Sequence, residues 1–134
     1  MAKKGTTVDK AQVCEEWLAA IQALLSEIRK WTAAAHWAVT EEQKDATEDL
    51  VGTYSIQVLR IKTPNGLLYV EPIGRDVLGA DGRVDLYSWP SLHRLLLLRQ
   101  QDQWRLRTES GVDWPEKWGK DTYLRLALTL TKTP

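Results

Sequence analysis

Four carboxylates in a glycine-rich stretch of the sequence could hold a metal ion. They are Glu71, Asp76, Asp81 and Asp85, and they lie between two segments with strand-like patterns. Oxygen ligands of this kind suit Mg²⁺, which assists the hydrolysis of phosphodiester bonds. Asp and Gly also dominate turns for backbone reasons, so the same residues fit a surface loop without a metal. The loop is the favoured interpretation, and a metal-dependent hydrolase or nuclease is an alternative hypothesis.

The other residues that could do chemistry do not form a recognisable catalytic set. His36 and His93 are the only histidines, and no cysteine ligand lies near either of them in the sequence. Cys14 falls on the apolar stripe of a predicted helix, which favours a small buried side chain over a nucleophile. A single cysteine cannot form an intrachain disulfide, so a reducing cytoplasm is the expected compartment. The sequence therefore favours a protein that is not an enzyme and predicts no cofactor.

A group of arginines near the C-terminal half of the chain could form a basic patch. Its members lie on a predicted hairpin and are Arg94, Arg99, Arg105 and Arg107. If they share one face, the patch could bind a nucleic-acid strand with the help of Trp104. Basic and acidic residues are equal at 18 each, however, and dedicated nucleic-acid binders usually carry a basic excess. A solvated outer sheet face is the favoured interpretation, and no nucleic-acid partner is expected. Weak nucleic-acid binding is a further alternative.

The N-terminal quarter of the chain has a regular apolar stripe. Apolar residues recur every seven positions from Cys14 to Ala35, with a second interleaved series from Trp17 to Ala38, and no Gly or Pro interrupts them. This spacing predicts an amphipathic helix of about eight turns, which begins near Lys10 with Asp9 as its N-cap. The stripe either packs on the chain's own core or pairs with a second copy. The pairing hypothesis gives the predicted partner-binding residues: Trp17, Ile21, Leu24, Ile28 and Trp31.

The middle of the chain has strand and turn patterns. Asn65-Gly66 between two apolar runs is a strong hairpin signal. The apolar alternation changes phase at Val58-Leu59, which indicates either a bulge or burial on both faces. Residues 91–101 fit a helix or a strand, and the alternation in 104–108 favours a strand pair over a helix there.

The assembled prediction is one α+β domain over residues 1–134. It comprises a flexible leader at 1–9, a helical part at 10–50, a sheet at 53–108 and a closing helix at 121–131. The helical part would hold a long helix and a short second helix over 41–50, and the sheet about five strands in a mostly antiparallel meander. No apolar run is long enough for a membrane span, so no membrane partner is expected.

The leading functional hypothesis is a small, soluble, non-enzymatic domain that binds another protein or assembles with itself. Self-association through the N-terminal helix is its most definite interaction feature. Tryptophans are enriched at binding hot spots, and Trp89, Trp114 and Trp118 are the expected anchors.

Overall fold

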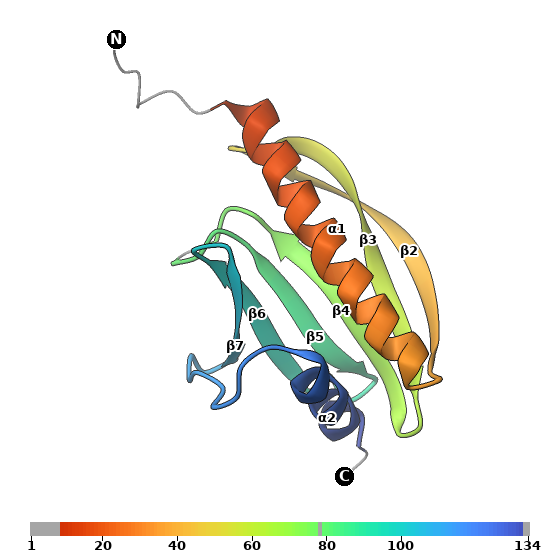
Figure 1. Cartoon of the computed structure of the whole chain (residues 1–134). Helices are drawn as coiled ribbons and strands as arrows, with labels where there is room; N and C mark the ends of the chain where they lie inside the picture. Colours follow the sequence, from red (N-terminus) through yellow and green to blue (C-terminus); the bar gives the residue numbers. More distant parts are fainter. Residues whose placement is uncertain (1–8, 78, 133–134) are drawn as a thin grey trace.

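A six-stranded antiparallel sheet with a helix before it and a helix after it forms the protein (Figure 1). The computed structural model describes residues 9–77 and 79–132, so the predicted leader lies, apart from Asp9, outside the described residues. The α+β class is confirmed, although the sheet has six strands rather than five. The elements in chain order are α1 (Lys10–Ala34), β2 (Ala38–Glu48), β3 (Gly52–Thr63), β4 (Gly66–Gly74), β5 (Arg83–Trp89), β6 (Arg94–Gln100), β7 (Gln103–Thr108) and α2 (Lys120–Thr131).

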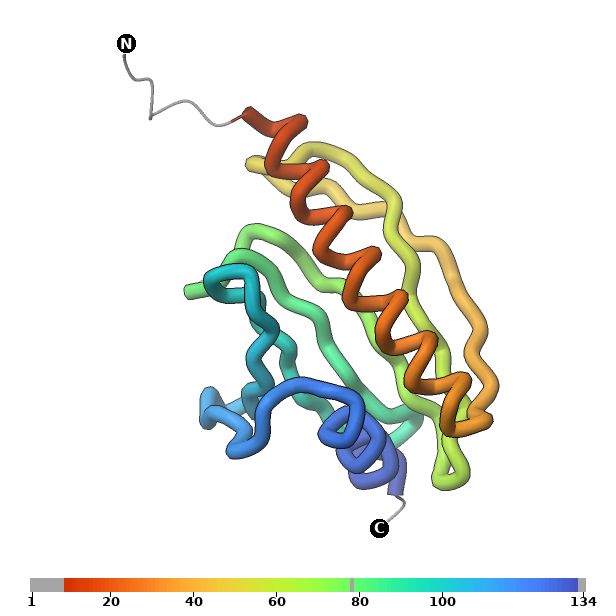
Figure 2. The backbone as a smooth tube through the Cα atoms, viewed as in Figure 1, coloured from red at the N-terminus to blue at the C-terminus, as the bar shows by residue number. Residues whose placement is uncertain are grey.

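Consecutive strands are also neighbours in the sheet, which makes it a simple meander from β2 to β7. Both helices lie on the same side of the sheet, as the tube in Figure 2 shows: α1 runs diagonally over β2 and β3, and α2 lies near β4 and β5. Of the described residues, none forms a helix on the opposite side. The sheet therefore has one face covered by helices and one face without them.

Helix α1 begins and ends at residues with clear local causes. The side chain of Asp9 accepts a hydrogen bond from the backbone N–H of Gln12 at 3.2 Å, which confirms the predicted N-cap. The helix has 25 residues and stops at Ala34, about one turn earlier than its apolar stripe suggests. His36 then adopts a positive φ of 63° and turns the chain into β2. The last positions of the stripe therefore belong to the sheet.

The predicted second helix over 41–50 is wrong, because most of this segment belongs to the edge strand β2. It pairs with β3 along its whole length, from Ala38 opposite Lys62 to Glu48 opposite Gly52. The Thr40-Glu41-Glu42 sequence resembles a helix start, but the segment has no apolar stripe that could hold a helix on the core. Pairing with β3 satisfies the backbone instead, and charged residues are well tolerated on an edge strand.

The phase change at Val58-Leu59 comes from burial on both faces of β3. The β2–β3 register runs through both residues without a shift, so there is no bulge between these two strands. Strand β3 pairs with β4 only from Leu59 to Thr63. Val58 and Leu59 are both buried at the point where β3 departs from β4.

The two predicted hairpins are present. The β3–β4 turn consists of Pro64 and Asn65, and Gly66 begins β4 with a φ of +152°. In the β6–β7 hairpin, alternate leucines face opposite sides of the sheet: Leu95 and Leu97 lie in the core. Residues 91–101 therefore contain a strand rather than a helix. The opposite edge of β7 is partly covered, because the N–H of Trp114 donates to the carbonyl of Leu106.

The core lies between the helices and the covered face of the sheet. Helix α1 contributes a stripe of side chains that are at most 2% exposed, and these pack with buried residues of β3 to β7 and of α2: the stripe consists of Trp17, Ile21, Leu24, Leu25 and Ile28. Four of the five predicted partner-binding residues are thus inside the domain, and the fifth, Trp31, is half-buried beside Trp118 and Tyr123. This stripe is not free to bind a second copy while the domain keeps this fold, and self-association stays a prediction.

Candidate functional site

The face of the sheet without helices carries a connected group of charged and aromatic side chains from several strands. Because side chains alternate along each strand, the registers of β3 to β7 decide which residues share this face. We call it the open face and define it by Arg60 and Lys62 of β3, Leu67, Tyr69 and Glu71 of β4, Arg83, Asp85, Tyr87 and Trp89 of β5, Arg94, Leu96 and Leu98 of β6, and Arg105 and Arg107 of β7. Six of these residues are cationic and two are carboxylates.

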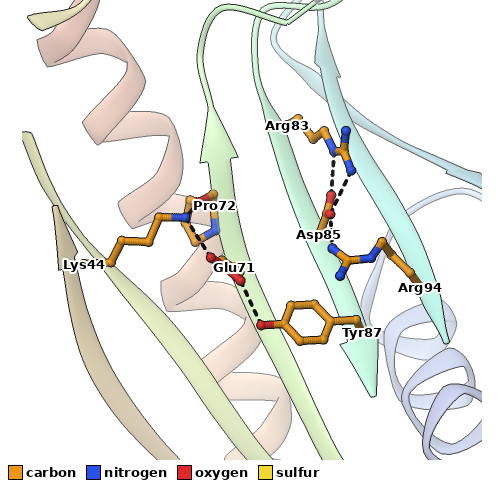
Figure 3. Close-up of polar contacts among 7 residues, drawn as sticks. All are labelled: Lys44, Glu71, Pro72, Arg83, Asp85, Tyr87 and Arg94. Carbon is orange, nitrogen blue, oxygen red and sulfur yellow. Dashed lines mark hydrogen bonds and ion pairs between the residues drawn. The ribbon is translucent and has the colours of Figure 1, made fainter. Parts of the chain in front are cut away.

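Asp85 lies at the centre of the open face and has no exposed surface. Its carboxylate accepts two hydrogen bonds from Arg83, at 2.7 Å from Nε and 2.9 Å from Nη2. It also accepts one from Nη1 of Arg94, which reaches it from the neighbouring strand (Figure 3). Two charge-assisted partners offset the cost of burying a carboxylate. The result is a pair of guanidinium groups held in fixed positions at a partly exposed surface.

Glu71 holds a second group of contacts beside the first. Its Oε2 accepts a hydrogen bond from Nζ of Lys44 at 2.8 Å, and its Oε1 accepts one from the hydroxyl of Tyr87 at 2.8 Å. Lys44 belongs to β2 and also donates to the carbonyl of Pro72, so it ties the edge hairpin to β4 (Figure 3). Burial alone would raise the pKa of Glu71. The hydrogen bonds from Lys44 and Tyr87, with the charges of Lys44 and Arg94, outweigh burial and hold this pKa below its ordinary value.

Replacing Glu71 with glutamine is expected to reduce the dependence of stability on pH. A carboxyl group with a lower pKa in the folded state stabilises the fold above its unfolded pKa, about 4.3, and loses this contribution as the pH falls through the folded pKa. Glu71→Gln should therefore be less stable than wild type at pH 7, by about 1 kcal/mol for a partly exposed pair. The difference should shrink below about pH 4.

The measurement for this prediction is the free energy of unfolding in urea at pH 7, 5, 4 and 3. The control is Glu42→Gln, which removes an exposed carboxylate that forms no ion pair among the described residues. A gap between Glu71→Gln and wild type that stays constant down to pH 3 would contradict the assignment.

A cross-strand row of two tyrosines with an arginine at each end crosses the open face. Arg60 lies opposite Tyr69, Tyr69 opposite Tyr87, and Tyr87 opposite Arg94. The two tyrosine rings stack almost in parallel, with centroids 5.3 Å apart and an interplanar angle of 7°. The Cζ of Arg94 lies 4.5 Å from the centroid of the Tyr87 ring, within cation–π range. The guanidinium group of Arg94 is thus held both by its contact with the Tyr87 ring and by its ion pair with Asp85.

One end of the open face is apolar and exposed. Trp89 is 53% exposed and lies opposite Leu67 in the sheet register. Leu92, in the turn after β5, is 48% exposed and has a positive φ of 61°, which is uncommon for a bulky residue. Of the three tryptophans predicted as anchors, Trp89 is the exposed one, while Trp114 and Trp118 are half-buried next to β7.

The four carboxylates predicted as metal ligands are not gathered into one site. Glu71 and Asp85 face each other across β4 and β5, but both are engaged by cationic side chains. Asp76 accepts a hydrogen bond from the N–H of Leu50, and Asp81 lies 3.9 Å from Arg75. Within residues 9–77 and 79–132, no three His, Cys, Asp or Glu side chains are placed to share a metal ion.

The predicted arginine patch is split between two faces. Arg94, Arg105 and Arg107 belong to the open face, whereas Arg99 pairs with Trp104 in register and binds Asp102 on the other side. The patch is also larger than predicted, because Arg60 and Lys62 extend it over β3. Their alternation with Leu59 and Ile61 is a signal that the sequence carries, but joining them to β6 requires the register of four strands.

Comparisons with protein-family models, with curated proteins and with solved structures gave no match for this chain. In the part of the chain that the structure describes, neither helix combines the length and the apolar character needed to cross a bilayer. The open face is therefore interpreted from its own residues alone.

Proposed function

We propose that this chain is a small, cytoplasmic, non-enzymatic binding domain whose open face holds an anionic macromolecule. The observation that carries the proposal is the charge that strands β3 to β7 place on this face: six cationic side chains and two carboxylates, in a chain whose net charge is zero. Segregated charge of one sign attracts a partner of the opposite sign and orients its approach.

The cations differ in how much of their charge is available. Asp85 partly neutralises Arg83 and Arg94, while Arg60, Lys62 and Arg105 form no salt bridge among the described residues. These three side chains are also exposed. They flank the fixed pair on both sides, so the surplus charge lies at the two margins of the face. Such a distribution suits an extended ligand that crosses the strands more than a small anion.

The same charge distribution bears on self-association. Two copies that met through their open faces would bring like charges together, which is destabilising. The apolar stripe of α1 is occupied by the core. A homo-oligomer would therefore have to use a different surface, and the open face would remain available to another partner.

The test is binding of a labelled, highly sulfated heparin fragment, measured by fluorescence anisotropy at 50 and 200 mM salt. We expect the triple variant Arg60→Gln, Lys62→Gln, Arg105→Gln to bind about tenfold more weakly, since each exposed ion pair contributes about 0.2–1 kcal/mol. Binding of the wild type should weaken steeply with salt.

The matched control is Arg99→Gln, on the same hairpin as Arg105 but on the helix-covered side. It should leave binding of the heparin fragment unchanged. Equal losses of affinity for Arg99→Gln and the triple variant, or no binding by the wild type at 50 mM salt, would contradict the proposal.

A further inference from the structure

We infer that the anionic partner of the open face is a single-stranded nucleic acid. This inference rests on the proposed function and adds the chemical class of the ligand. Binding of a single strand requires a surface that offers both positive charge for the phosphates and an accessible aromatic ring on which a nucleobase can stack. Positive charge alone would bind an acidic peptide equally well, so the aromatic residues are what distinguish a nucleic acid from a peptide as the partner.

Trp89 supplies the accessible ring. Its side chain is 53% exposed at the end of β5, on the same face as the cations. Tyr69 and Tyr87 cannot serve in this way, because each ring is stacked against the other and Arg94 lies over Tyr87. The two stacked tyrosines instead support the guanidinium group of Arg94. One exposed indole beside several cations is the pattern expected when a base stacks on the protein.

Two cations flank Trp89 at the spacing that the sheet imposes. Leu67 separates Trp89 from Lys62 in the cross-strand row, so Lys62 lies two strands away, about 10 Å. Arg94 lies opposite Tyr87, which makes it a diagonal neighbour of Trp89 on the next strand. A base on the indole would therefore have a cation on either side for the flanking phosphates. Arg94 is held in place by Asp85 through Nη1 alone, and the rest of its guanidinium group donates no hydrogen bond among the described residues, so these N–H groups can receive a phosphate without reorganisation.

The shape of the face selects a single strand over a duplex. Five strands contribute to it, and at about 4.8 Å between strands its width is about 19 Å. The major groove of duplex DNA is about 12 Å wide and admits a helix or a two-stranded ribbon. A broad sheet face cannot enter it. A single strand lies across such a face with its bases unpaired and free to stack.

The experiment compares three labelled probes with the full chain by fluorescence anisotropy at the same salt concentration: a 15-nucleotide oligothymidylate, the corresponding 15-base-pair duplex, and a 15-residue polyglutamate peptide. We expect the oligothymidylate to bind at least tenfold more tightly than either of the others. We also expect the salt slope of its log affinity to fall in magnitude by about 1.4 when Arg60 and Lys62 are both changed to Gln.

Substitutions at Trp89 separate stacking from charge. Trp89→Leu should weaken oligothymidylate binding about tenfold, since stacking on one aromatic ring is lost, while polyglutamate binding changes less than twofold. Trp89→Phe keeps a ring and should remain within about threefold of wild type. Circular dichroism confirms that each variant is folded before its affinity is compared.

The outcomes distinguish this inference from the proposed function. If the heparin fragment and polyglutamate bind through the open face but the oligothymidylate binds no better, the inference is overturned and the proposed function stands. Duplex binding as tight as single-strand binding also overturns it, as does a Trp89→Leu variant with unchanged affinity for oligothymidylate. If no polyanion binds at low salt, both fail together.

Discussion

Replacing Gly82 with valine is expected to lower the free energy of unfolding by about 3 kcal/mol or more. A Cβ at this position would lie 2.2 Å from Cζ3 and 2.7 Å from Cη2 of Trp17, far inside van der Waals contact. Trp17 has little room to withdraw, because it is 1% exposed, donates to the hydroxyl of Tyr54 at 3.2 Å and packs against Trp104. Gly82 also has a φ of +151°, which L side chains rarely adopt.

The control for Gly82→Val separates steric overlap from backbone strain. Gly111 has a φ of +93° and no atom within 4 Å of the position its Cβ would take. Gly111→Val should therefore lose only the strain energy, about 1–2 kcal/mol. Urea denaturation of both variants measures the difference. Equal losses would mean that the contact between Gly82 and Trp17 is looser than the structure describes.

Replacing Ile28 with lysine is expected to cost at least about 4 kcal/mol and to unfold most of the protein. Ile28 has no exposed surface and lies in the main core cluster between α1 and the sheet. A lysine there would bury an ammonium group without a partner and would remove a well-packed apolar side chain. Circular dichroism and the urea midpoint should both report the loss.

The control for Ile28→Lys is Ala23→Lys, an exposed position on the same helix with the same added charge. It should change stability by less than about 0.5 kcal/mol. Light scattering after size exclusion adds a direct test of the pairing hypothesis. A wild-type dimer that becomes a folded monomer on Ile28→Lys would mean that the stripe binds a second copy and that the described packing is wrong.

Local patterns predicted those elements whose causes are local. Asp9 caps α1, Asn65-Gly66 marks the β3–β4 hairpin, and the closing helix over 121–131 matches α2 within a residue. Segment 41–50 was predicted incorrectly because its helix-like start competes with pairing to β3, a partner about ten residues away. A short stretch of sequence shows the helix-like start, but it does not show which strand the segment will pair with.

The open face could be predicted only in part, for a related reason. Arg94, Arg105 and Arg107 share a hairpin, so their alternation places them together. Arg99 is five residues from Arg94 on the same strand, so alternation alone places its side chain on the opposite face. The row that joins Arg60 to Arg94 through two tyrosines depends on three successive strand pairings. Such a row leaves no contiguous motif in the sequence.

The two edges of the sheet limit how a partner can be recognised. Strand β2 presents charged residues along its free edge, and β7 is partly covered by the segment that contains Val112 and Trp114. Both features disfavour the addition of another strand, whether from a second copy or from a peptide. Backbone groups at the edges are thus poorly placed to bind a partner. Selectivity for the proposed partner would then come from side chains, and substitutions on the open face would change that selectivity without altering the sheet.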